Sequence, residues 1–331
     1  MVYFATAEEQ RFVQRGLLPG VRRQRTVEEL RGWNWHQPPL KPIYGGEPLG
    51  MHEVSGKYCP TGRDVFLRRV QAVHAPANRG MRDGRVLHAE IARLFVAAKR
   101  LVYLHGANCV PHLARLAETM DGRDEPAAPD DSLEVAAKVE ALRNFEIRRI
   151  AERVEGVLAA QPHAEPDALA ILAMPVHVEI KLDGRYLGMS GHLAADALAF
   201  PEMTVLDLKF GPREPFHRLT TTGYALVLES LYEVPVDVGC VVYVRFVNGR
   251  VVVERDYHVI GDELRQTFVE ERDDKMRSVS EELDPGLPDR CPGTCPYLPT
   301  CRPADGAVGA PDRAVPANLL HRERAAVPAS A

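Results

Sequence analysis

The sequence predicts an α/β fold of the α+β type, in which a central mixed sheet is flanked by helices. The first observation is the order of elements: helical spacing of apolar residues gives way to three strands, a helix, a strand pair and a closing helix. The second is Asn248-Gly249, which separates two β-branched runs and is typical of a tight hairpin. The third is size, because 331 residues with 45% hydrophobic content can bury a sizeable core.

The N-terminal part, residues 1–78, is expected to be an arm followed by a short helix. Residues 1–58 are rich in Pro and Gly and carry the Trp pair of RGWNWHQPPLKP, which favours an arm packed on the body. Helical spacing then predicts a helix over 63–73. A longer helix begins near Arg82, and its apolar residues repeat with a period near 3.6: Val86, Leu87, Ile91, Leu94, Phe95 and Ala98.

Residues 79–284 are expected to form the core, with a helical insertion. The polar stretch 121–131 predicts a surface loop, and 133–158 predicts a helix. The alternating, β-branched segments predict three strands and then a strand pair, at 171–184, 185–199, 202–210 and 236–259. Asp183-Gly184 is read as a hairpin turn between the first two strands. Helices are expected over 217–233 and 263–283.

The net charge of −5 provides no global positive field for nucleic acid, although local charge decides such binding. No apolar run approaches the roughly 18 residues of a membrane span, and no signal peptide is apparent. We therefore expect a cytoplasmic protein without a membrane partner. Residues 285–302 form a Cys-rich loop, and the Pro/Ala-rich residues 303–331 are expected to be a disordered tail.

Two acidic residues on neighbouring strands are the main candidates for chemistry. Asp196 lies near the end of the second expected strand and Asp207 near the end of the third, and an antiparallel pairing would bring them together. Two like charges repel unless a cation lies between them. Carboxylates and carbonyls, including the backbone carbonyl of Leu208, suit Mg²⁺ or Mn²⁺.

Lys209 follows Asp207 by two positions, so both side chains should lie on one face of the strand. An ammonium there can orient a nucleophile or neutralise charge on a reacting phosphate. A structural Asp–Lys pair is the alternative, but the spacing Asp-(x10)-Asp-x-Lys favours a nuclease. Glu179 is a secondary acidic candidate that a solvent-facing strand position would also explain.

With the helix carrying GRVLH (84–88), these residues resemble the RecB form of the PD-(D/E)xK nucleases. The resemblance implies a restriction-endonuclease-like core with His88 as a further metal ligand. That family continues with Gln-x-x-x-Tyr on the next helix, and here Thr220 and Tyr224 stand at those positions. Tyr224 is therefore a catalytic candidate, with a packed helix aromatic as the alternative.

Four cysteines are candidate ligands of one metal centre. Cys291, Cys295 and Cys301 share one Pro-rich loop, and Cys59 also precedes a proline and opens a helix. Ligand type alone leaves Zn²⁺ and a [4Fe–4S] cluster open. One cysteine before the core and three after it resemble the iron–sulfur nucleases of the RecB superfamily, which implies the cluster. The remaining two, Cys109 and Cys240, read as buried thiols.

Within that superfamily the chain is most similar to the CRISPR-associated exonucleases of the archaeal type I-A Csa branch. The similarity rests on RGWNW (31–35), YCPTGRD (58–64), LGMSGHLAADAL (187–198), DLKFG (207–211), GYALVLES (223–230), PVDVGCVVYV (235–244) and the terminal cysteines. It implies a metal-dependent DNA exonuclease that trims single-stranded or overhang-bearing DNA before an adaptation integrase and its accessory subunits insert it as spacers. The alternatives are a weakly active DNA-binding subunit and a recombination or repair nuclease.

A DNA substrate also needs basic residues beside the acidic site. Arg82, Arg85, Arg213 and His217 flank the motifs and are the candidate phosphate contacts. Arg68 and Arg69, on the helix after Cys59, are weaker candidates. Arginines on exposed helix faces usually serve only to keep those faces solvated.

Overall fold

The five strands form one mixed sheet with the order β1-β2-β3-β4-β5. The computed structural model describes residues 2–46, 48–120, 132–201 and 203–302. The strands are β1 (Val176–Leu182), β2 (Leu193–Ala199), β3 (Thr204–Lys209), β4 (Val238–Val247) and β5 (Arg250–Val259). Only β3 and β4 are parallel, and the other neighbours are antiparallel. This confirms the predicted mixed sheet.

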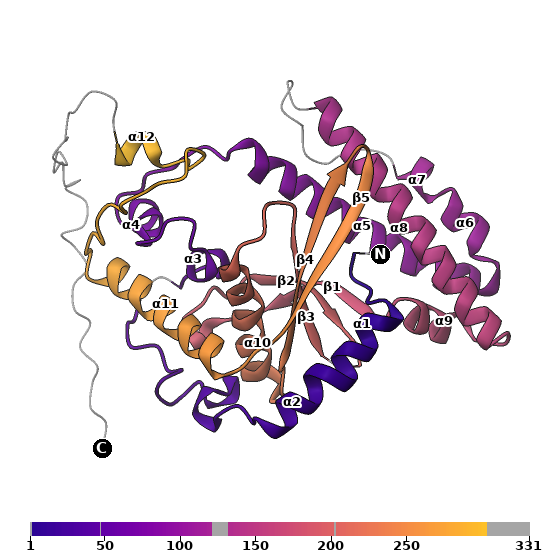
Figure 1. The fold of residues 1–331 in the computed structure, drawn as a ribbon, viewed down its shortest axis with the longest axis horizontal. Coiled ribbons are helices and arrows are strands. Elements are labelled where there is room, and N and C mark those ends of the chain that lie inside the picture. The colour runs from indigo at the N-terminus through magenta and orange to yellow at the C-terminus, as the bar shows by residue number, and fades with distance from the viewer. Residues whose placement is uncertain (1, 47, 121–131, 202, 303–331) are drawn as a thin grey trace, which may run out of the picture.

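Helices cover both faces of this sheet (Figure 1). On one face lie α3 (Met51–Ser55), α10 (Arg218–Tyr232) and α11 (Asp262–Ser280). On the other lie α5 (Arg79–His105), α8 (Ser132–Ala160) and α9 (Pro166–Ala173). Helix α10 connects β3 to β4, so it is the crossover that a parallel pair requires.

The remaining helices are short. They are α1 (Ala7–Phe12), α2 (Leu18–Arg23), α4 (Arg63–Arg69), α6 (Val110–Ala114), α7 (Leu116–Thr119) and α12 (Leu298–Cys301). A π-helical turn, Val13–Leu17, joins α1 to α2. Among the described residues, no helix is both long enough and apolar enough to cross a membrane.

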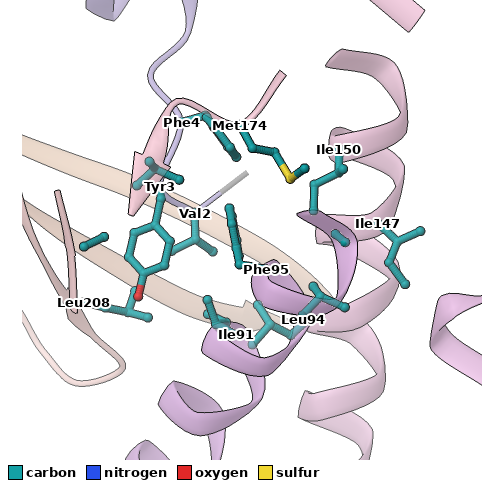
Figure 2. Close-up of a cluster of buried hydrophobic side chains, with 14 of the residues drawn as sticks. Val2, Tyr3, Phe4, Ile91, Leu94, Phe95, Ile147, Ile150, Met174 and Leu208 are labelled. Carbon is teal, nitrogen blue, oxygen red and sulfur yellow. The ribbon is translucent and has the colours of Figure 1, made fainter. Parts of the chain in front are cut away.

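The N-terminal residues Val2, Tyr3 and Phe4 are part of the main core. All three are buried and pack with Phe95 of α5 (Figure 2). The ring centroids of Tyr3 and Phe4 lie 5.4 and 5.5 Å from that of Phe95. The Tyr3 hydroxyl points toward Leu208 of β3. The first residues therefore support β3 from behind, on the face opposite α10.

The arm is fastened to the body by a buried charge network around Glu229 of α10. The Glu229 carboxylate accepts hydrogen bonds from Arg31 (2.8 Å), from the backbone N–H of Gly32 (2.8 Å) and from Arg265 (2.7 and 2.9 Å). A Cβ on Gly32 would lie 2.1 Å from the Leu226 carbonyl oxygen, so only glycine fits. Removing one partner of such a buried pair costs about 3–5 kcal/mol.

The connection between β1 and β2 differs from the predicted hairpin. Residues 183–192 form a loop with a 3₁₀ turn, Arg185–Leu187, and β2 begins only at Leu193. Gly184 has φ −92°, which a type I′ turn excludes. The cause is pairing with the arm: Leu49 bridges Met189, so this segment is held away from a tight turn.

The other boundaries shift less. Residues 171–173 belong to α9 rather than to the first strand, and α4 ends at Arg69, four residues before the predicted end. Asn248 and Gly249 both have positive φ (48° and 72°), which confirms the predicted turn between β4 and β5. The predictions for 121–131 and for the tail 303–331 lie outside the described residues.

Candidate active site

The site forms where the side-chain alternation of β1 reverses. Val176 and Val178 pack in the core on the α5 side, whereas Ile180 and Leu182 pack on the α10 side. Glu179 lies between these pairs with φ +53°, a left-handed conformation that costs free energy for a glutamate. Such irregularities are common beside active sites, where they re-aim a side chain. Glu179, secondary in the sequence, thus lines the cavity described below.

Strand β2 reverses its alternation at the residue opposite Glu179. Ala197 packs on the α5 side and Ala195 on the α10 side, so the reversal falls at Asp196. The β2–β3 pairing runs from Ala199↔Thr204 to Ala197↔Leu206, and the next position in this register is Asp196 opposite Asp207. Asp196 also accepts a hydrogen bond from the Leu208 backbone N–H at 2.7 Å. Three carboxylates therefore stand in a row across β1, β2 and β3.

Lys209 is the cation beside this row. Its Nζ lies 3.0 Å from Oδ1 and 2.8 Å from Oδ2 of Asp207. Burial alone would lower the pKa of Lys209, but the carboxylates of Asp207 and Asp196 raise it above its ordinary value, so Lys209 is an ammonium. As predicted, Asp207 and Lys209 share a face, and Leu208 between them is fully buried in the opposite core.

The carboxylates carry more negative charge than one lysine neutralises. Burial and, to a smaller extent, the charge of Glu179 raise the pKa of Asp196 to about 6, against the opposing effects of Lys209 and of the Leu208 hydrogen bond. Burial and the charge of Asp196 together raise the pKa of Asp207 to about 6, although Lys209 opposes this rise. A second positive charge in the row would relieve this repulsion.

His88 approaches the row from α5. Its Nδ1 lies 3.6 Å from Asp196 Oδ2, its ring packs edge-on against Phe210, and it hydrogen-bonds the Leu208 backbone. Burial lowers the pKa of His88, so the imidazole is neutral at pH 7, which is the form that binds metals. The structure thus brings His88 together with Asp196, Asp207 and Lys209.

These groups line a cavity of about 880 Å³ whose opposite wall is basic. Helix α4 contributes Arg68 and Arg69, and the two guanidiniums share the single buried carboxylate of Glu53, at 3.1 and 2.5 Å. His52, His74 and His192 add three imidazole rings to the lining. Arg68 and Arg69, the weaker sequence candidates, are therefore the arginines that face the site.

The two positions of the Gln-x-x-x-Tyr pattern also face the cavity from α10. Tyr224 donates a hydrogen bond from its hydroxyl to the Ala194 carbonyl of β2 at 2.5 Å, so it positions the strand that carries Asp196. Thr220 shares a hydrogen bond with Ser55 of α3 at 3.0 Å. Thr220 therefore fastens α3 to α10, although it lacks the reach of a glutamine.

The structure does not bring the four predicted phosphate contacts together. Arg82, Arg85 and Arg213 are exposed and do not line the cavity, and Arg213 pairs with Glu254 on the β4–β5 hairpin. His217 does line the cavity, but it is 3% exposed, and both ring nitrogens contact tyrosine hydroxyls. Burial and Lys209 lower its pKa to about 4, so it has neither charge nor an open nitrogen for a phosphate.

The four cysteines predicted to bind one metal centre lie near one another at the N-terminal end of α4. Burial raises the pKa of Cys295, and the charges of Cys291, Cys59 and Cys301 raise it further, so all four thiols lie within electrostatic reach. Arg63 of α4 donates to the Cys301 sulfur at 3.4 Å. Figure 1 shows α12 and the preceding loop beside α4. Cys109 and Cys240 are fully buried, as predicted.

The residue types at the carboxylates and at the four cysteines suit a divalent ion and a cysteine-bound metal centre, respectively. The arrangement of these side chains does not form a complete set of metal ligands. In the described part of the chain, no three His, Cys, Asp or Glu side chains are arranged to hold a metal ion. The hard oxygen donors and surplus charge around Asp207 suit Mg²⁺ or Mn²⁺. In a [4Fe–4S] cluster each cysteine binds a different iron, so the sulfurs need only surround a volume.

Sequence reasoning missed several residues of the cavity. His52, Glu53, Tyr58, Ser190, His192 and Phe216 all line it. Tyr58 lies inside the motif YCPTGRD, and Ser190 and His192 lie inside LGMSGHLAADAL, but neither motif identifies which side chain faces the site. Only the docking of the arm against β2 reveals them.

Comparison with known proteins gives one consistent family. A family model described as "CRISPR-associated exonuclease Csa1" matches residues 2–304. A protein of that name from Thermoproteus tenax is 34% identical over 275 residues, which are 83% of this chain and 91% of that protein. Another of the same name, from Saccharolobus solfataricus, is 28% identical over 287 residues, covering 83% of this chain and 92% of that protein.

The excess negative charge of the carboxylates should lower the stability of the folded protein when no divalent ion is bound. An Asp196 carboxyl with a pKa near 6 in the folded protein keeps its proton longer than in the unfolded chain, where the ordinary value is 3.8. Stability should therefore fall as the pH rises from about 4 to about 6. Asp196→Asn removes this loss and keeps an acceptor for the Leu208 N–H.

In divalent-free buffer at pH 7, Asp196→Asn should be about 1–3 kcal/mol more stable than the unmodified protein, and about equal to it at pH 4. Urea unfolding at the two pH values measures this difference. Asp274→Asn, on the exposed side of α11, is the matched control and should change neither value. A variant less stable than the unmodified protein at pH 7 would contradict the charge imbalance.

Proposed function

The chain belongs to the family of CRISPR-associated exonucleases named Csa1, and on this premise we propose that it is a divalent-metal-dependent DNA exonuclease. It would hydrolyse phosphodiester bonds and trim DNA fragments before an integrase inserts them as new spacers. The family supports the nuclease assignment. The trimming role and the integrase as partner are proposed from the sequence resemblance described above.

The observation that carries the proposal is the row of carboxylates beside Lys209, facing a basic wall across one cavity. A phosphodiester carries negative charge, so Arg68 and Arg69 can attract it, whereas the carboxylates alone would repel it. The acidic row therefore makes sense only with a cation between it and the substrate.

For that cation we propose Asp196 and Asp207 as the principal ligands, with His88 and the Leu208 carbonyl completing the set. A bound Mg²⁺ or Mn²⁺ supplies a Lewis acid and lowers the pKa of a nearby water. Asp207 is buried and Asp196 is partly buried, so both are largely desolvated in advance and attract such an ion strongly.

Lys209 contributes what the carboxylates cannot. Its ammonium is fixed by two contacts to Asp207, so its remaining proton can point into the cavity toward a phosphate oxygen or the attacking water. It thereby stabilises negative charge that develops on the phosphate. Tyr224 holds β2 through Ala194 and is a positioning residue for Asp196.

For the four cysteines we propose a [4Fe–4S] cluster, with Zn²⁺ as the alternative. Cys59 lies just before α4, and the other three lie beyond α11, so a shared centre would close more than two hundred residues into a loop. Closing so long a loop stabilises the whole fold, and loss of the centre should loosen it. The partial exposure of all four thiols leaves room for a cluster.

A second candidate function is a DNA-binding iron–sulfur subunit with an idle nuclease site. Thr220 at the glutamine position favours it, because the threonine hydroxyl is hydrogen-bonded to Ser55 and its side chain is shorter than that of a glutamine. A recombination or repair nuclease is a third possibility, which co-purification with a CRISPR integrase would exclude.

Lys209→Ala tests the nuclease assignment. Degradation of single-stranded DNA in Mn²⁺ should fall by roughly 100-fold or more, because one preorganised donor to the reacting phosphate is lost. Lys41→Ala, an exposed lysine of the arm, is the control and should retain full activity. Equal activity in both variants would remove Lys209 from the mechanism, and an inactive unmodified protein would favour the binding subunit.

Elemental analysis tests the cysteine centre. Protein purified without oxygen should contain about four irons per chain. Cys59→Ala should lose iron and soluble yield, whereas Cys240→Ala, which removes a core thiol, should keep its iron. Zinc in place of iron would refute the cluster and leave a four-cysteine site, and the absence of both metals would refute any metal centre.

A further inference from the structure

Tyr58 is an exposed aromatic side chain at the wall of the cavity. It is 59% exposed and lies in the segment that joins α3 to α4. The other strongly exposed aromatic side chains of the described residues are Phe12, Tyr103, Tyr186, Phe200 and Tyr232, and none of them lines this cavity. Tyr58 therefore combines an exposed aromatic ring with a place in the cavity lining, which suits it to stack on a planar ligand group.

The ring is fixed in place despite its exposure. The Tyr58 hydroxyl lies 2.9 Å from His217 Nε2, and His217 Nδ1 lies 3.1 Å from the Tyr243 hydroxyl. The Tyr243 hydroxyl donates to the Glu214 carbonyl at 3.5 Å, which leaves its oxygen to accept from Nδ1–H. Nε2 of the neutral imidazole is then an acceptor, and Tyr58 donates to it.

A second contact holds the ring from the side. Phe216 packs against Tyr58 edge-to-face, with centroids 4.9 Å apart and an interplanar angle of 86°. A hydrogen bond at the tip and an aromatic contact at the body restrict both side-chain torsions. An exposed ring that is already ordered loses little entropy when a planar ligand stacks on it.

Tyr58 is also within electrostatic reach of the reacting groups. Partial enclosure of the hydroxyl raises the pKa of Tyr58, the Lys209 ammonium opposes this rise, and the Asp207 carboxylate adds to it. Tyr58 and Lys209 line the same cavity, so a nucleotide with its phosphate at Lys209 can place its base at Tyr58. The carboxylates occupy the sheet side, so the aromatic wall is an apolar surface available to the base.

We propose that Tyr58, backed by Phe216, is a stacking platform for an unpaired nucleobase of the nucleotide beside the scissile phosphate. This inference rests on the proposed function and specifies its substrate. A base inside a duplex has both faces covered by its neighbours, so it cannot stack on Tyr58. The platform therefore selects single-stranded DNA or a frayed end, and it is indifferent to sequence because every base has an aromatic face.

The test compares two oligonucleotides of equal length and charge, one with normal bases and one with abasic sites. Binding is measured in the Lys209→Ala protein, so that neither strand is degraded during the titration. The base-bearing strand should bind roughly 10-fold tighter than the abasic strand, because stacking of one base on an aromatic ring strengthens binding by about that factor. Tyr58→Ala should abolish this preference by weakening the base-bearing strand alone.

Tyr58→Phe keeps the ring and should keep most of the preference, and Tyr103→Ala, a tyrosine of α5 exposed to 60%, should leave it unchanged. In otherwise unmodified protein, Tyr58→Ala should raise KM for single-stranded DNA far more than it lowers kcat. An unchanged preference in Tyr58→Ala, or equal weakening of both strands, would overturn the proposal. The binding comparison needs no catalysis, so it can succeed or fail independently of the nuclease assay.

Discussion

The crowding of negative charge at one edge of the sheet is the constraint on which the rest of the site depends. Glu179, Asp196 and Asp207 stand side by side on three strands, with Lys209 as their neighbouring cation. Folding places them there at a cost, since β1 adopts a left-handed conformation at Glu179 and two buried carboxyls have a raised pKa. Strain of this kind clusters at functional sites, and it supports the proposal that a divalent cation, whose charge and ligand preference fit, binds between these carboxylates.

The surrounding structure keeps this crowded edge in place. Leu208 anchors β3 in the core, where Tyr3 lies behind it, and Tyr224 secures β2 from the other face. The Glu229 network fastens the arm to α10, and α4, which follows the arm, places Arg68 and Arg69 in the lining of the cavity that holds the acids. One short segment then joins the two proposed sites, because Tyr58 lines the cavity and the adjoining Cys59 is a proposed ligand of the cysteine centre.

The sequence predicts some of this well, for physical reasons. The short connection between β2 and β3 permits one antiparallel register, so the approach of Asp196 to Asp207 follows from spacing alone. Glu179 could not be placed, because the alternating residues of VHVEIKL look like one regular strand and nothing in them signals a reversal. His217 was misjudged for a similar reason: its charge depends on burial beneath Tyr58 and Tyr243, which are distant in sequence. The local sequence pattern therefore predicts how neighbouring strands pair. Whether a side chain is exposed depends on packing between segments that are distant in the sequence.

The most direct test of the central claim is to locate a manganese ion by anomalous diffraction from crystals soaked in Mn²⁺. The account predicts one strong peak at ligand distance from the carboxylates of both Asp196 and Asp207. Those two residues would then share the ion that their surplus charge requires. Manganese bound elsewhere only, or no peak between these carboxylates at millimolar concentration, would contradict it.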